Sequence, residues 1–240
     1  TSGTFKSRIL NTNLKFNFFN DEKIIKIYNS YFRSKNLSFQ NEIFITLNPF
    51  LDINSKINID EINSQIFKVI NFNKIIKSKH FIKKINSKNE INFKPKKVHK
   101  YLVDEASLDI ELIYGRLIYT KKFSISESLF ECFGDVNFLE DYPILSFNCS
   151  VLSKNKQKLF KKFSIKSKSE DKSLQINVVG NLNILNKKIN FKEILTNGNN
   201  KVVREDLIFF KKNFESIILT DNFYESFNKR KIEKFITEVL

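Results

Sequence analysis

Strict alternation of apolar and polar residues is the pattern in this sequence that most restricts the fold. It is clearest over residues 174–184, where apolar side chains alternate with Gln and Asn. Shorter runs of the same kind occupy residues 14–18, 43–47, 51–59 and 108–114. Because successive side chains along a β-strand point to opposite faces, each run predicts a strand with one apolar and one polar face. Such strands are typical of antiparallel sheets that are covered on one side.

Helical spacing of apolar residues replaces this alternation in three regions. An Asn-Asp pair, suitable as an N-cap, precedes residues 22–33, and residues 72–85 place apolar side chains opposite a lysine-rich face. Residues 203–240 contain two further apolar stripes. We therefore predict a mainly β protein with some α structure. Its β-rich domain covers residues 1–195, with helices near 22–33 and 72–85, and an amphipathic helical tail covers residues 203–240.

The apolar face of such a sheet must be covered, and the residues alone leave the covering open. A second sheet or the chain's own helices would give a β-sandwich or an α+β core, whereas a lipid would leave an open sheet. The helical tail could cap the end of a groove, dock a partner or cap the chain's own core.

The formal net charge of +15 raises the question of a nucleic-acid partner. The lysines, however, are spread along the whole chain, arginine is scarce and no nucleic-acid-binding motif is present. Abundant Lys, Asn, Ile and Phe together are what an AT-rich genome encodes. We therefore expect no nucleic-acid partner, and a diffuse positive charge suits anionic lipid headgroups at least as well.

No apolar run approaches the ~20 residues that a membrane-spanning helix needs. The first ten residues do not have the pattern of a signal peptide, and the sequence contains no Met. We expect the chain to be a fragment or a processed product from which an export signal or membrane anchor is absent.

Residues suited to catalysis or metal binding are few. His80 and His99 lie in lysine-rich surroundings without an acidic or cysteine partner at metal-ligand spacing. The acidic pairs at 104–105 and 140–141 fall between predicted strands, where solvated turn carboxylates are expected. No nucleotide-binding, hydrolase or zinc-protease motif occurs. We expect a protein that is not an enzyme and that has no metal ion or cofactor.

Both cysteines of the chain lie in successive alternating segments, Cys132 in residues 129–138 and Cys149 in residues 144–151. A hairpin that turns at residues 140–141 brings the two apolar faces together and sets one cysteine opposite the other. In that register the cysteines form a non-hydrogen-bonded pair with Cα atoms roughly 4.5–5.5 Å apart, within the range of a disulfide.

Pro143 agrees with the same register, because a residue without an N–H fits a position where the hairpin needs no donor. Two interpretations of the cysteines stay open. They could be reduced core residues, or they could form a disulfide, which indicates an oxidising compartment such as the bacterial periplasm. Their predicted pairing favours the disulfide, and the lack of close Cys doublets or a nearby His argues against zinc.

Four segments are similar to a known family: YGRLIYTKKFSISES (114–128), FECFGDVNFLEDYPILSFNCS (130–150), KKFSIKSKS (161–169) and VVGNLNILNKKINFKEI (178–194). They resemble the C-terminal part of AsmA-like proteins from AT-rich bacteria. That bridge-like lipid-transfer superfamily also includes AsmA, TamB and YhdP. The similarity extends from about residue 14 onward, and it lies in successive amphipathic strands and phrases with no active-site signature.

The resemblance implies an antiparallel meander curved into an open groove, or half-barrel, with a helical C-terminal tail. It implies a periplasmic protein that is anchored in the inner membrane by a helix absent from this chain. Phospholipid acyl chains would pass along the apolar interior of the groove between the inner and outer membranes. Such transport contributes to outer-membrane lipid homeostasis or assembly. The implied partners are phospholipid, the membranes and outer-membrane assembly factors, and no catalytic residue is implied.

A second hypothesis keeps the same strands but fills the β core with protein. The chain would then be a non-catalytic structural or interaction module for outer-membrane protein assembly. Under the lipid hypothesis, apolar residues on the predicted strands replace water around acyl chains, at roughly 25 cal/mol per Å² of apolar area buried. The residues expected to line the groove are Leu108, Ile110, Leu112, Phe130, Val136, Phe138, Leu145, Phe147, Leu174, Ile176, Val178, Leu182 and Ile184.

Overall fold

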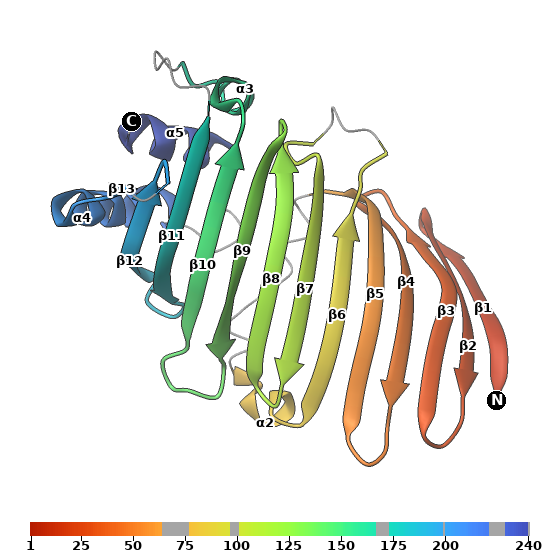
Figure 1. The fold of residues 1–240 in the computed structure, drawn as a ribbon. Coiled ribbons are helices and arrows are strands. Elements are labelled where there is room, and N and C mark those ends of the chain that lie inside the picture. Colours follow the sequence, from red (N-terminus) through yellow and green to blue (C-terminus); the bar gives the residue numbers. More distant parts are fainter. Residues whose placement is uncertain (64–76, 97–100, 167–172, 199, 221–228, 240) are drawn as a thin grey trace. The chain divides into compact units, whose positions relative to one another are not determined.

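The computed structural model describes residues 1–63, 77–96, 101–166, 173–198, 200–220 and 229–239. Within these residues, thirteen strands form one open sheet in which every strand lies beside its neighbours in the sequence (Figure 1). β1 and β13 are the two edge strands, so the sheet is not closed into a barrel. The prediction of a mainly β, mostly antiparallel open sheet with helices near the C-terminus is confirmed.

The chain divides into two compact units, which are described separately below. Unit 1 contains residues 1–98, 105–121 and 137–139. Unit 2 contains residues 99–104, 122–136 and 140–240.

Unit 1 is built from the first seven strands and the beginning of the eighth. They are β1 (Ser2–Ile9), β2 (Thr12–Asn20), β3 (Ile24–Arg33), β4 (Leu37–Thr46), β5 (Leu51–Ile62), β6 (Ile85–Phe93), β7 (Glu105–Ile113) and β8 (Arg116–Ile125). β1 to β5 form an antiparallel meander, and β6 pairs antiparallel with β7. β5 and β6 run parallel, with residues 57–59 (INI) directly beside residues 91–93 (INF).

The helix predicted near residues 22–33 is wrong, because this segment forms β3. A β-bulge explains the misleading spacing: pairing with β4 shifts between Ile27 and Ser30, and Asn29 has a φ of 49°. The extra residue puts Ile27 and Phe32 on the same face although they are five positions apart. Apolar spacing along this strand therefore departs from two and imitates a helical period.

Only part of the second predicted helix, 72–85, can be assessed, since residues 72–76 lie outside the described residues. Within the remainder, α2 covers Lys79–Ile82 and β6 already begins at Ile85. The predicted helical tail is confirmed: α4 (Arg204–Asn213), a π-helical turn η3 (Phe214–Ile218) and α5 (Lys229–Val239) follow the last strand.

Unit 2 continues from β8 with the remaining strands. They are β9 (Ser128–Asn137), β10 (Ile144–Ser153), β11 (Leu174–Asn183), β12 (Lys188–Thr196) and the short β13 (Asn200–Lys201). A short helix, α3 (Lys156–Lys162), follows β10, and the Asn155 side chain caps it by accepting the Lys158 N–H. In Figure 1, α4 and α5 lie beside β11 and β12 of this unit.

Candidate functional site

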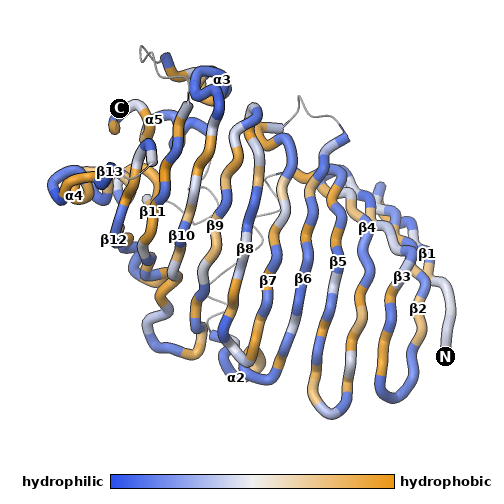
Figure 2. Tube along the Cα trace, viewed as in Figure 1, coloured by the Kyte–Doolittle hydropathy of each residue, from blue (hydrophilic) through white to orange (hydrophobic). Residues whose placement is uncertain are grey.

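Cross-strand pairing gathers the apolar residues of β1 to β7 on one face of unit 1. Residues paired directly across two strands share a face, so the register alone decides which side chains lie together. Figure 2 shows the resulting alternation of hydropathy along the strands. The apolar face of unit 1 includes Phe5, Ile9, Leu14, Phe16, Phe18, Ile25, Ile27, Phe32, Phe39, Ile43, Ile45, Leu51, Ile53, Ile57, Ile59, Ile85, Ile91, Phe93, Leu108, Ile110 and Leu112.

Phenylalanine rings pack against each other across the strands of this face. Phe5 stacks on Phe16 with ring centroids 5.1 Å apart, and Phe16 lies 6.4 Å from Phe18. Phe32 and Phe39 form a second stack with centroids 5.2 Å apart. These contacts order the rings of β1 to β4 into a continuous apolar surface.

The apolar face of unit 1 is incompletely buried. Ile9 and Phe5 remain 65% and 45% exposed, Ile85 is buried, and the other members of the face are half-buried. Among the described strand residues of this unit, Ile85 is the only apolar side chain that is buried. A sheet face of this composition normally lies against a second layer of apolar groups. The partial exposure of the apolar face therefore makes this face the candidate binding surface of unit 1.

The opposite face of unit 1 is polar and carries ion pairs between neighbouring strands. Lys56 binds Glu90 at 3.2 Å, and Lys88 binds Glu111 at 3.0 Å. The hydrogen bond from Asn92, together with Lys56, lowers the pKa of Glu90, and the hydrogen bond to Glu111 raises the pKa of Lys88. Both shifts keep these groups charged near neutral pH, which favours contact of this face with water.

A shallow hollow of about 450 Å³ lies over β3 to β6. Its lining includes the charged residues Lys26, Glu42 and Lys56, and the Lys26 ammonium lies 5.4 Å from the centre of the Phe44 ring. Charged walls make this hollow a poor place for an acyl chain. The apolar face of unit 1 is therefore the better candidate for a lipid.

In unit 2, the corresponding apolar face is covered by the chain's own helices. Leu182 and Ile189 form a buried cluster with Ile217 and Ile218 of the C-terminal region. Edge-to-face ring contacts continue from the sheet into the helices: Phe147 to Phe191, Phe191 to Phe214 and Phe214 to Phe235. A second cluster contains Ile125 of β8, Leu159 of α3 and Phe163. Side chains of the C-terminal helical region and of α3 therefore cover this face of unit 2.

The thirteen residues predicted to line a groove are divided between these two environments. Leu108, Ile110 and Leu112 lie on the apolar face of unit 1 and are half-buried. Phe138, also in unit 1, is 4% exposed, and its N–H donates to the Gly115 carbonyl. Contact of these four residues with lipid stays a prediction.

The other nine residues belong to unit 2. Leu145, Phe147 and Leu182 pack in the cluster of the C-terminal helices, and Phe130 and Leu174 pack in the cluster around α3. Val136 is 2% exposed, whereas Ile176, Val178 and Ile184 are half-buried. Contact of these residues with lipid also stays a prediction.

Sequence reasoning missed most of the apolar face of unit 1, namely its members on β1 to β6. The signal was available, because the alternation over residues 14–18, 43–47 and 51–59 already assigned Phe16, Ile45 and similar side chains to one face.

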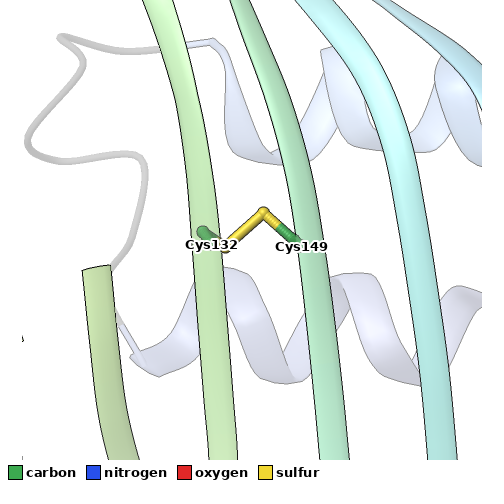
Figure 3. Close-up of a disulfide and its surroundings, with 2 residues drawn as sticks. All are labelled: Cys132 and Cys149. Atoms are coloured by element: carbon green, nitrogen blue, oxygen red, sulfur yellow. A yellow bond between two sulfur atoms is a disulfide. The ribbon is translucent and has the colours of Figure 1, made fainter. Parts of the chain in front are cut away.

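The predicted pairing of the two cysteines is confirmed. Cys132 of β9 lies directly opposite Cys149 of β10, and a disulfide joins them with Cα atoms 4.1 Å apart (Figure 3). The short Cα distance is typical of a non-hydrogen-bonded pair. Val151 lies opposite Phe130 in the same register, so the apolar faces of the two strands coincide as expected.

The histidine and the acidic residues singled out in the sequence lie at separate places in the described part of the fold. No three His, Cys, Asp or Glu residues there are placed to hold a metal ion. His80 is exposed on α2, and His99 lies outside the described residues. Asp104 accepts the Ser126 N–H at 2.7 Å, which is a structural role, and Glu140 and Asp141 are exposed in the turn after β9.

None of the described helices combines the length and the apolar character that crossing a bilayer requires. Comparison of the chain with family models, with curated proteins and with solved structures finds no match. What this chain does must therefore be inferred from its own residues and from the way the fold places them.

Proposed function

We propose that this chain binds the acyl chains of phospholipids on the apolar face of unit 1. It acts without catalysis in moving phospholipid between the inner and outer membranes, in the manner of AsmA-like proteins. One observation carries the proposal: the sheet face of unit 1, made of Phe, Ile and Leu from seven strands, is only half-buried, with Ile85 as the sole buried apolar side chain among the described strand residues of that unit.

The dimensions of this face suit an acyl chain. Neighbouring strands lie ~4.8 Å apart, so the six intervals from β1 to β7 span roughly 29 Å. The hydrocarbon core of a bilayer is ~30 Å thick and contains two opposed acyl chains, so a single chain needs roughly half that length. Each methylene that leaves water on such a surface contributes about 0.8 kcal/mol, and the contact needs no directional bond. A lipid could therefore occupy many positions along the face with similar free energy.

One observation and one resemblance predicted from the sequence support the proposed periplasmic location. The Cys132–Cys149 disulfide is typical of an oxidising compartment. The strand-and-phrase similarity to AsmA-like proteins favours the bacterial periplasm and an inner-membrane anchor outside this chain. Outer-membrane assembly factors are further proposed partners on the same ground.

A second candidate function is favoured by unit 2. Its apolar face is filled by Phe214, Ile217, Ile218 and Phe235 rather than left open. A filled core is typical of a structural or interaction module, here one that serves outer-membrane protein assembly. The two functions differ in whether the purified protein binds lipid.

Binding of a fluorescent fatty-acid probe to paired variants tests the proposal. Ile57→Asp places a charge in the middle of the apolar face of unit 1, whereas Asn58→Asp places the same charge on the opposite face of the same strand. We expect the first variant to weaken probe binding roughly tenfold or more, because a carboxylate on an apolar surface is poorly solvated. The second variant should bind like the wild type.

Circular dichroism serves as the control for folding of both variants. Lipid extraction followed by mass spectrometry of the protein purified from membranes gives an independent measurement, in which phospholipid should accompany the wild type. Absence of phospholipid together with equal probe binding by both variants would contradict the proposal and favour the structural module.

A further inference from the structure

The turn between β1 and β2 exposes two large apolar side chains at one end of unit 1. Ile9 and Thr12 close a two-residue turn in which Leu10 is 94% exposed, while Ile9 itself is 65% exposed. Leu10 and Asn11 have φ values of 44° and 64°. This left-handed conformation suits Asn and Gly and is disfavoured for Leu. An exposed leucine in this conformation contributes nothing evident to folding, which makes Leu10 a candidate for a contact outside the chain.

Cationic side chains lie next to this hairpin tip. Arg8 pairs with Asn13, and Asn13 pairs with Arg33, so both arginines lie on the polar face, two strands and roughly 10 Å apart. Lys35 lies in the turn between β3 and β4. That turn is at the same end of the sheet, because β2 runs antiparallel to both β1 and β3.

The charges of this region lack the acidic partners found elsewhere on the polar face. Lys6 lies directly opposite Lys15, a like-charge pair that is unfavourable without an anion. Within the described residues, Arg8, Arg33 and Lys35 form no ion pair, in contrast to the Lys–Glu pairs between β5, β6 and β7. Neither the β1–β2 turn nor the β3–β4 turn contains an acidic residue. An anion outside the chain would complement these charges.

We propose that the β1–β2 tip inserts Ile9 and Leu10 into the surface of a bilayer that contains anionic phospholipid, while Arg8, Arg33 and Lys35 contact the headgroup phosphates. An apolar tip beside a group of cations matches the two layers of such a surface, since acyl chains lie directly beneath charged headgroups. A nucleic acid would engage the cations but leave Leu10 in water. Leu10 lies in the turn and outside the strands, whereas Ile9 is the last residue of β1 and shares the face of Phe5. Leu10 therefore separates this contact from acyl-chain binding.

Flotation of the full 240-residue chain with lipid vesicles tests this contact. Vesicles contain equal parts of phosphatidylcholine and phosphatidylglycerol, and pure phosphatidylcholine vesicles serve as the comparison. Leu10→Asn removes the apolar side chain and provides a residue suited to positive φ, so the hairpin should remain folded. We expect this variant to bind the anionic vesicles roughly tenfold more weakly than the wild type.

Three further variants separate the effect of charge from that of insertion, and one end of the sheet from the other. The Arg8→Gln and Arg33→Gln substitutions should each reduce binding about fivefold, as expected for one cation near an anionic surface. Phe50→Asn is the matched control, because Phe50 is 63% exposed in the β4–β5 turn at the opposite end of the sheet. It should leave vesicle binding unchanged.

Several results would overturn the proposal. They are equal binding by wild type and Leu10→Asn, equal binding to anionic and neutral vesicles, or a loss caused by Phe50→Asn instead. Binding of a single-stranded oligonucleotide that needs both arginines but not Leu10, without binding to vesicles, would assign the cations to nucleic acid and equally reject the proposal. Leu10→Asn should still bind the fatty-acid probe normally, so failure here is distinguishable from failure of the acyl-chain function.

Discussion

The backbone of β9 passes so close to β10 at Gly134 that no side chain fits between them. A Cβ atom at this position would lie 2.0 Å from the carbonyl oxygen of Ser146 and 2.8 Å from its carbonyl carbon. The Ser146 hydroxyl also accepts the N–H of Asp135 at 3.0 Å, which holds the two strands together at this point. β10 cannot easily move aside, because its other edge pairs along its whole length with β11.

Replacing Gly134 with Ala should therefore destabilise the protein by about 3 kcal/mol, since one strand must shift. Urea unfolding followed by circular dichroism measures this change. Gly3→Ala is the control: its Cβ would meet only the ring of Phe18, at 3.0 Å, and a side chain can move. The control should cost less than about 1 kcal/mol. Equal losses in the two variants would show that the close approach at Gly134 is unimportant.

At the scale of single elements, the β9–β10 hairpin shows what the sequence could predict. Alternation on both strands left one register in which the apolar faces coincide, and the structure has that register around Cys132 and Cys149. β3 shows the opposite case. Its bulge at Asn29 is a property of pairing with β4. The bulge breaks the period of two along the segment, and the sequence alone does not distinguish that irregular spacing from a helical one.

The disulfide of this hairpin should contribute to stability by restricting the unfolded chain. It closes a loop across a sequence separation of 17 residues, for which the loss on reduction is about 3 kcal/mol. Urea unfolding with and without dithiothreitol measures the difference, and the Cys132→Ser, Cys149→Ser double variant should match the reduced protein. Two titratable thiols in the native, unreduced protein would contradict this prediction.

At the scale of the whole molecule, two units with the same strand pattern differ in what covers their apolar faces. Alternation predicted one-sided sheets in both, but it contains no information about the covering layer. Phe214 and Phe235 follow a helical period, and the sequence could not reveal that they pack on Phe191 of unit 2. Likewise, the half-burial of Ile57 and its neighbours depends on the absence of such a layer among the described residues of unit 1.

This difference predicts unequal protection of backbone amides from hydrogen exchange. β11 and β12 pack against apolar side chains of the C-terminal helical region and should exchange more slowly than β3 and β4, which have few buried contacts. Addition of phospholipid should slow exchange in β3 and β4 and leave β11 and β12 unchanged, because a bound ligand stabilises the region that it contacts. Mass spectrometry of peptides from each strand measures both effects. Equal protection before and after lipid addition would contradict acyl-chain binding in unit 1.

The strand order also bears on how the chain acquires its structure. Because each strand pairs with its neighbours in sequence, most pairings close only a short turn, and the parallel step from β5 to β6 is an exception. Closing a short loop costs little conformational entropy. Strands of such a meander can therefore pair before segments that are distant in the sequence come together. Each strand then depends mainly on the two beside it, as in repeat proteins. The eight-residue edge strand β1, which has a partner on one side only, should accordingly open more often than the strands inside the sheet.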